Sequence, residues 1–496
     1  MMDLTWMRNA KGLTVSEVEE LDALLSVYRK TRRRNGAIED YYEGDVMARD
    51  IGVDILPEEA RDKVHVDLSC DWARKAVKAL ANHVRFDGFV FDGGGMDEGL
   101  GRALRRGNFD AEFSRTRVGT LKKGVSFACV NNVGTSASVT FHSADNGAAL
   151  VNEATGRIRS GFVIADCGRT EWAPKKSVVR QVNLHMPGSR VAIVRDGPRT
   201  WHAERVETPP DAMMMVPVIY EPTDKKPLGG TRITKDVRSV IDDVLSVRLA
   251  IAVSRAFYAI PMRAVLGLTE AMYNALKDKP QWNMYINPFL MATMDKQGHT
   301  PNIAQLPSNQ PDALIRLIET DAKLFAAATG VPLQSLGIVQ DNPSSAEAIV
   351  EARRDLIEDA QSFEDEHLIP ALRQIALLVM MVESNKASVD ELDEVQRSVM
   401  PHFRNPAMPS IAATTDAAMK IASVNPAFAQ TDVFFEMVGF DQATIERTNS
   451  QMRMNQARAN VAAQPILMNR PATEMPKRTE EPQQPTTTTS GETDED

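Results

Sequence analysis

The sequence has few cysteines and no long apolar run, and both shortages exclude classes of protein. Only three cysteines occur in 496 residues, Cys70, Cys129 and Cys167, with no C-x-x-C pair. An odd, scattered set cannot build a disulfide framework or a zinc ribbon, so we predict buried, reduced thiols. The longest apolar run, residues 375–382, is far shorter than the roughly 20 residues that span a bilayer. The N-terminus has no apolar signal-peptide core, so we expect a protein that stays inside a cell.

The usual signatures of catalysis are missing as well. No G-x-x-x-x-G-K-[ST] loop, G-x-S-x-G motif or H-E-x-x-H pair occurs. Three glycines at 93–95 lack the lysine of a phosphate loop, and we interpret them as a flexible loop. Residues 364–367, Glu-Asp-Glu-His, are more typical of a solvated helix face or a subunit contact than of a metal site. The sequence therefore predicts no enzyme activity, no cofactor and no metal.

The charge is mildly acidic and unevenly distributed. The net charge is −10, from 57 basic and 67 acidic residues. Residues 471–496 hold seven acids and two bases, a net of −5, so half of the acidity lies in this tail. The tail is rich in Pro, Thr and Glu, a composition that predicts disorder. A basic excess is the mark of a tight duplex-DNA binder, and its absence disfavours that function.

Residues 231–385 form the axis of the predicted fold. A helix is predicted over 234–260, capped by Thr234 and stopped by Pro261. Proline and glycine then interrupt the chain until a second helix opens at Pro311 and ends at Gly330. An ordered loop, 331–344, leads into a helix over 345–385 that we expect to be kinked at Pro370.

The segment before this axis is predicted to be a mixed α/β platform, and the segment after it a helical cap. Thr14 and Glu17 form a capping box for a first helix that should end near the basic run Lys30 to Arg34. We interpret that run as a solvated helix end, although it could also touch phosphates. Two more helices, 66–86 and 110–123, precede an antiparallel meander of short strands, and short helices follow residue 385. The predicted strands are 125–131, 137–142, 157–165, 178–185, 190–195 and 200–206.

A series of short motifs resembles the portal proteins of tailed bacteriophages, in particular the SPP1-like and actinobacteriophage family. Each motif is weak alone, but their order along residues 15–455 is specific. One departure is the entry to the helix at 234, where the family more usually has Gly-Arg-Ser-Glu and this chain has Gly-Thr-Arg-Ile at 230–233. The matching landmarks are Tyr-Tyr-Glu-Gly-Asp at 41–45, Gly-Val-Ser-Phe at 124–127, Val-Pro-Val at 216–218, Ala-Ile-Pro-Met-Arg at 259–263, Thr-Gly-Val-Pro at 329–332 and Asp-Asn-Pro-Ser-Ser-Ala-Glu-Ala-Ile at 341–349.

This resemblance implies an α+β fold, mostly α, whose parts are an α/β wing, a two-helix stem, a small α/β clip, a long kinked spine helix and a helical crown. It also implies a dodecameric ring at one capsid vertex of the virion, assembled in the host cytoplasm. Double-stranded DNA would pass through its channel without sequence-specific binding. Its partners would be further copies of itself, the large terminase, a head–tail adaptor and the major capsid and scaffold proteins, with no membrane. By position the segments are the wing 1–230, the stem helices 231–260 and 311–330, the clip 261–310, the tunnel loop 331–344, the spine 345–385, the crown 386–460 and the disordered tail 461–496.

Three groups of residues are the candidate sites. The polar tunnel loop is expected to face DNA, although loop solvation or helix capping would explain the same residues. The stem stripe is expected to pack between subunits because a thin subunit cannot cover it. The tunnel-loop residues are Gln334, Ser335, Val339, Gln340, Asp341 and Asn342; the stem residues are Val237, Ile241, Val244, Leu245, Leu317 and Leu324; the clip residues, expected to contact a partner, are Trp282, Tyr285 and Phe289.

Two other functions remain open from the sequence alone. A nucleic-acid-processing enzyme or motor subunit would need a phosphate or metal site, which the motifs do not supply. Another capsid or scaffold component of the same virion would differ from a portal in its ring stoichiometry.

Overall fold

The computed structural model describes most of the chain in two separate units. Contacts divide the chain into residues 1–419 and 420–496, and each unit is described by itself. The predicted clip, residues 339–344 of the tunnel loop, the glycines at 93–95 and the acidic tail lie outside the described residues. The described residues are 4–45, 68–92, 97–133, 136–171, 173–209, 212–258, 311–338, 353–407, 411–440 and 442–463.

The first long helix, α1 (Val15–Glu43), begins as predicted but runs well past the basic run. Thr14 caps it through the expected capping box with Glu17. The helix continues because Ile38 and Tyr42 are buried, so their tertiary packing outweighs the glycine at 36. It ends at Gly44, whose φ of 79° is the left-handed conformation that glycine adopts at a helix end. The expectation that the helix ends near Arg34 was therefore wrong.

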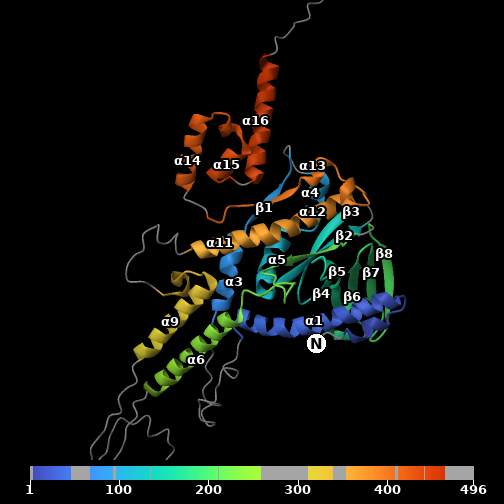
Figure 1. Ribbon diagram of the computed structural model, residues 1–496, viewed down its shortest axis with the longest axis vertical. Helices are drawn as coiled ribbons and strands as arrows, with labels where there is room; N and C mark the ends of the chain where they lie inside the picture. The colour runs from blue at the N-terminus through green and yellow to red at the C-terminus, as the bar shows by residue number, and fades with distance from the viewer. Residues whose placement is uncertain are drawn as a thin grey trace, which may run out of the picture. The chain divides into compact units, whose positions relative to one another are not determined.

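Within the described residues, the strands between Val125 and Ile219 form two antiparallel sheets, of five and three strands, rather than the single predicted meander. In the five-stranded sheet, each strand pairs with the next along the chain, and η1 (Thr5–Asn9) and α1 pack against it (Figure 1). In the three-stranded sheet, β2 lies between β3 and the distant β9. The strands are β2 (Val125–Val133), β3 (Ser136–Ser143), β4 (Gly147–Val151), β5 (Ile158–Thr170), β6 (Ala173–Met186), β7 (Ser189–Arg195), β8 (Trp201–Glu207) and β9 (Met215–Ile219).

A cluster of phenylalanines joins the helices of the wing to a segment far along the chain. Strand β1 (Phe86–Val90) pairs with β10 (Met400–Phe403), and the ring of Phe86 packs on those of Phe109, Phe113 and Phe403. Residues 400–403 thus complete a core built by helices near the start of the chain. The helices of this region are α3 (Trp72–His83), α4 (Glu98–Arg106) and α5 (Phe109–Lys123).

The spine is interrupted just before Pro370. Its described part consists of α11 (Arg354–Ser362), the π-helical turn η5 (Phe363–Leu368) and α12 (Ile369–Glu383). Proline has no N–H to give to the preceding turn, and the wider π turn accommodates that loss. Pro370 therefore lies at the irregularity, as predicted, but its form is a π turn.

Short elements follow the spine, and the second unit is helical. The chain passes through η6 (Val389–Glu391) and α13 (Glu394–Arg397), and α14 (Ile411–Val424) crosses the boundary between the units. The second unit continues with η7 (Phe428–Gln430), α15 (Asp432–Val438) and α16 (Gln442–Ala463). Asn449 of α16 donates to Asp432 of α15 at 2.6 Å.

The three cysteines lie in different environments. Cys70 and Cys129 are buried free thiols, as expected, but Cys167 is exposed, which corrects the prediction for that residue. Its strand, β5, turns this position toward solvent. Within the described ranges, no helix has both the length and the apolar character of a membrane span.

The π turn also contains a buried carboxyl group. Glu364 is 4% exposed, and its Oε1 has no hydrogen-bond partner among the described residues. Burial raises the pKa of Glu364 from 4.5 to about 8, against a lowering by the backbone N–H of Arg85. Nearby Asp365 raises the pKa further. The folded chain therefore holds a proton here that the unfolded chain releases at a lower pH.

We predict that Glu364→Gln removes a pH dependence of stability. Between about pH 4.5 and 8 the unfolded wild-type chain binds fewer protons at this position than the folded chain, so wild-type stability falls as pH rises. Glutamine cannot titrate, so the variant should melt at a higher temperature than the wild type at pH 8 and show a flatter profile. Calorimetry across this range measures both. Exposed Glu153→Gln is the control, and equal slopes for all three chains would contradict the prediction.

Candidate functional site

The predicted stem is a pair of helices packed side by side, α6 (Lys235–Tyr258) and α9 (Pro311–Thr329) (Figure 1). The Thr234 hydroxyl accepts from the N–H of Val237 at 3.3 Å, as a helix cap does. Phe325 of α9 is fully buried, and its ring packs against Trp72 of α3 with centroids 5.2 Å apart. One end of the pair is thus fixed in the wing core.

The two faces of the stem have different environments. Val237, Ile241, Val244 and Leu245 are at most 2% exposed and belong to the core of this single chain. They pack within their own subunit. We propose packing between subunits only for Leu317 and Leu324, on the outer face of α9.

That outer face is apolar and open. Leu317 is 49% exposed and Leu324 is 55% exposed, and their spacing of seven residues places them on one stripe of α9. Ile315 is also 48% exposed, but it is two residues from Leu317 and therefore lies on a different side of the helix. Two large apolar side chains at half exposure on one stripe form a surface that another chain can cover.

Arg232 is a buried cation that contacts α3, Tyr220, α11 and the end of the second stem helix. It is 6% exposed, and it stands just before α6. Its Nε donates to the carbonyl of Ala76 in α3 at 3.0 Å, and its Nη1 donates to the Tyr220 hydroxyl at 3.0 Å.

The remaining contacts of Arg232 reach the second stem helix and the spine. Nη1 also meets Asp359 Oδ2 of α11 at 3.1 Å, and Nη2 donates to the carbonyl of Thr329, the last residue of α9. That carbonyl has no partner within its own helix, because the last turn of a helix leaves its acceptors free. Arg232 therefore fixes the inner ends of both stem helices.

A second polar contact joins the stem to α1. The Tyr41 hydroxyl donates to Asp242, with distances of 2.8 and 2.9 Å to the two carboxylate oxygens. Burial raises the pKa of Asp242, and the bond from Tyr41 opposes that rise. Sequence reasoning singled out the motif at 41–45 but did not place it in contact with α6. No local signal reports a pairing across 201 residues.

The base of the tunnel loop is anchored while two polar side chains remain exposed. Gly330 has a φ of 64°, the left-handed conformation that ends α9. The next residue, Val331, is 1% exposed and anchors the loop in the core. A short 3-10 helix, η4 (Leu333–Leu336), follows within the segment that was expected to be an ordered loop. Gln334 and Ser335 are exposed on this turn.

Several predicted residues cannot be placed. Val339, Gln340, Asp341 and Asn342 of the loop lie outside the described residues, as do Trp282, Tyr285 and Phe289 of the clip. Among the residues that are described, no three His, Cys, Asp or Glu side chains gather in a way that could hold a metal ion.

Comparison with known proteins adds independent information. The family model "Phage portal protein, SPP1 Gp6-like" matches residues 21–431, more than half of the chain. The chain is 24% identical over 419 residues to the portal protein of Mycobacterium phage L5, with 81% of each chain covered. It is 23% identical over 414 residues to the portal protein of Mycobacterium phage D29, again with 81% of each chain covered.

Solved structures give a weaker likeness. A chain in the neck of a native GTA particle, computed with C12 symmetry, is similar with a TM-score of 0.39 and 14% identity, covering 74% of this chain and 89% of that one. A chain in the neck of an empty GTA particle, computed with C6 symmetry, has a TM-score of 0.38 and 15% identity, covering 72% and 86%.

We predict that Arg232→Met lowers the free energy of unfolding by about 3 kcal/mol, because it leaves buried carbonyls without a donor. Asp359→Asn is the matched control. The Asp359 side chain is 50% exposed, so its ion pair is worth less than about 1 kcal/mol. Arg232→Lys should restore less than half of the loss, since an ammonium cannot reach acceptors in several directions at once. Urea unfolding measures all three, and equal effects of Arg232→Met and Asp359→Asn would contradict the role given to Arg232.

Neighbouring residues of α9 give a second prediction. Phe325→Ala should cost about 3–5 kcal/mol of unfolding free energy, because it empties a fully buried site against Trp72. Leu324→Ala should cost less than about 1 kcal/mol in the isolated subunit, since that side chain is half exposed. Urea titrations of subunits kept dilute enough to remain single test this difference. Similar losses would show that the packing of α9 has been misassigned.

Proposed function

The chain belongs to the SPP1 Gp6-like family of phage portal proteins, and we propose that its copies close into a ring whose channel conducts duplex DNA during packaging and ejection. Portal proteins are structural, non-enzymatic parts of the phage virion, located at the capsid vertex.

The outer face of α9 is the observation that carries the ring proposal. Leu317 and Leu324 remain half exposed after the subunit has folded, whereas the facing stripe of α6 is covered. A cyclic ring presents each subunit with the next one at the same angle, so one apolar stripe on every copy can be covered without leaving an open end. We therefore assign Leu317 and Leu324 to packing between subunits, in a ring that is a dodecamer by analogy with the family.

The segment after α9 is the proposed channel loop. Gln334 and Ser335 are exposed and uncharged, so they can meet the DNA backbone without holding its phosphates. A conduit needs this property, because tight phosphate binding would resist movement of the duplex. Val339, Gln340, Asp341 and Asn342 extend the same loop, and their assignment rests on the sequence.

The remaining assignments follow the order of segments. Residues 1–230 and the spine are proposed as the outer wing, which is consistent with the packing of α12 on α4, β2 and β3. Residues 261–310, with Trp282, Tyr285 and Phe289, are proposed as the clip that meets the large terminase and later the head–tail adaptor. The wing is the proposed contact for the major capsid and scaffold proteins.

We predict that the double variant Leu317→Asp/Leu324→Asp fails to form rings. Two carboxylates on the stripe would be buried against the next subunit without partners, which should reduce ring yield to about a tenth or less of the wild-type yield. Electron microscopy and native mass spectrometry of the purified chain measure the yield. The control is Val15→Asp, which places one such carboxylate on a valine that is 78% exposed at the start of α1. Normal rings from the double variant would refute the assignment of this stripe.

A further inference from the structure

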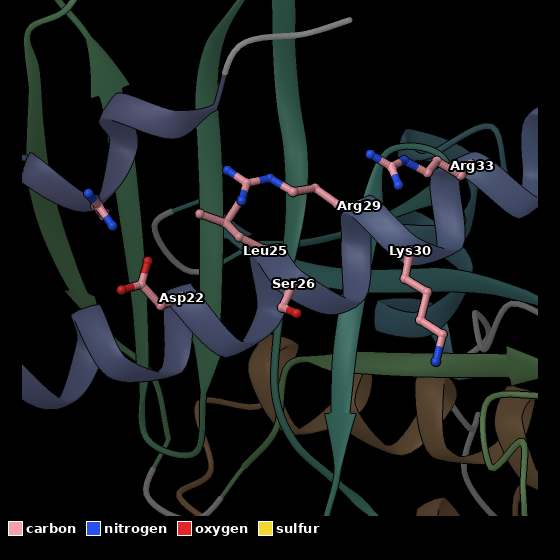
Figure 2. A pocket seen from close by; sticks show the side chains of 7 residues that line it. Asp22, Leu25, Ser26, Arg29, Lys30 and Arg33 are labelled. Atoms are coloured by element: carbon pink, nitrogen blue, oxygen red, sulfur yellow. The ribbon is translucent and has the colours of Figure 1, made fainter.

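A basic groove lies along the outer side of α1, in a part of the subunit with no role in the proposed channel. The groove has a volume of about 630 Å³, and Figure 2 shows the side chains of Arg29 and Arg33 on successive turns of the helix. Its position on α1 separates it along the chain from α9 and the loop that follows. The lining residues are Arg8, Asp22, Leu25, Ser26, Arg29, Lys30 and Arg33.

The charge of the groove is strongly one-sided. Four cations face one carboxylate, that of Asp22, although the whole chain carries a net charge of −10. Arg8, Arg29, Lys30 and Arg33 are exposed, and none forms an ion pair within the described part of the chain. Arg29 and Arg33 stand four residues apart on one helix face, where like charges repel. An anion from outside the subunit would relieve that repulsion.

The backbone under the groove is anchored by buried packing, so the helix positions that carry the cations are set before any ligand arrives. Leu21 and Leu24, on the opposite face of α1, are fully buried against the five-stranded sheet. The Tyr28 hydroxyl donates to the carbonyl of Asp145 at 2.9 Å and fixes the middle of the helix. Met7, fully buried, anchors the short helix that carries Arg8.

We propose that this groove binds the sugar–phosphate backbone of double-stranded DNA without sequence specificity. Three of the four cations are arginines, whose planar guanidinium groups match phosphate oxygens in a bidentate geometry. Arg29 and Arg33 follow one direction along the helix, and Arg8 adds a cation from a second element. Such a row of cations can neutralise backbone phosphates of any sequence, which is the basis of non-specific binding.

Other ligands fit the same residues less well. An acidic peptide would need buried apolar anchors, and the one apolar lining residue, Leu25, is only 3% exposed. Single-stranded nucleic acid binds through bases stacked on aromatic rings, and no lining residue is aromatic. Small-molecule sites are lined mainly by apolar and aromatic side chains, whereas only one of these lining side chains is apolar.

The test is a measurement of duplex binding against salt with the full chain. A mixed-sequence 30-base-pair DNA is titrated between 50 and 300 mM NaCl, with fluorescence anisotropy as the readout. Each arginine that neutralises a phosphate contributes about 0.9 to the slope of log affinity against log salt. We expect the variant Arg8→Gln/Arg29→Gln/Arg33→Gln to reduce that slope by about 2.7 and to bind at least tenfold more weakly at 50 mM salt.

The matched control removes the same three charges elsewhere on the same unit. Arg157→Gln/Lys175→Gln/Lys176→Gln alters exposed cations outside the groove and should leave the slope close to that of the wild type. Equal losses in both triple variants, or no wild-type binding at 50 mM salt, would overturn the proposal. Stronger wild-type binding to a single-stranded oligonucleotide or to polyglutamate than to the duplex would also overturn it. Electron microscopy of each variant shows whether it still forms rings. A loss of DNA binding by the groove can therefore be distinguished from a loss of the ring.

Discussion

The fold depends most on one buried guanidinium group, that of Arg232. Its donors reach α3, the residue after β9, the end of α9 and α11, while its backbone leads into α6. A buried cation is tolerated only when its donors are satisfied, so these elements must keep their relative positions for the chain to fold. The wing, the stem and the spine therefore meet at a polar junction inside an otherwise apolar core. Apolar packing there could slide, whereas directed hydrogen bonds fix the geometry.

The sequence predicted those elements whose signals are local. Thr14, Thr234, Pro311 and Gly330 mark helix ends through the chemistry of one or two residues, and the structure has helix ends at each of them. The division of the strands into two sheets was not predicted, because β2 pairs with β9 across some 90 residues of chain and alternation does not reveal partners. The end of α1 was missed for a similar reason: Ile38 and Tyr42 extend the helix through distant contacts.

The sequence predicted the apolar residues of the stem, and the structure shows which of them are buried within the chain. Periodicity placed apolar stripes on both stem helices, but it cannot tell whether a stripe faces its own subunit or a neighbour. Burial separates Ile241 and Leu245, which are covered within the chain, from Leu317 and Leu324, which are not. The contact between Tyr41 and Asp242 and the role of Arg232 had no sequence signal, since both join residues far apart in the chain.

The π turn before Pro370 acts as a one-residue insertion in the spine. An extra residue advances a helix by about 100° of rotation, so the faces of α11 and α12 are out of phase. The consequence is visible in their neighbours: α11 packs on α3, while α12 packs on α4 and on strands of the three-stranded sheet. The helical spine therefore contacts two surfaces that a regular helix would contact only if it were bent. In evolutionary terms, a single inserted codon is enough to explain such a change of facing, and relatives with a regular spine would be one residue shorter at this point.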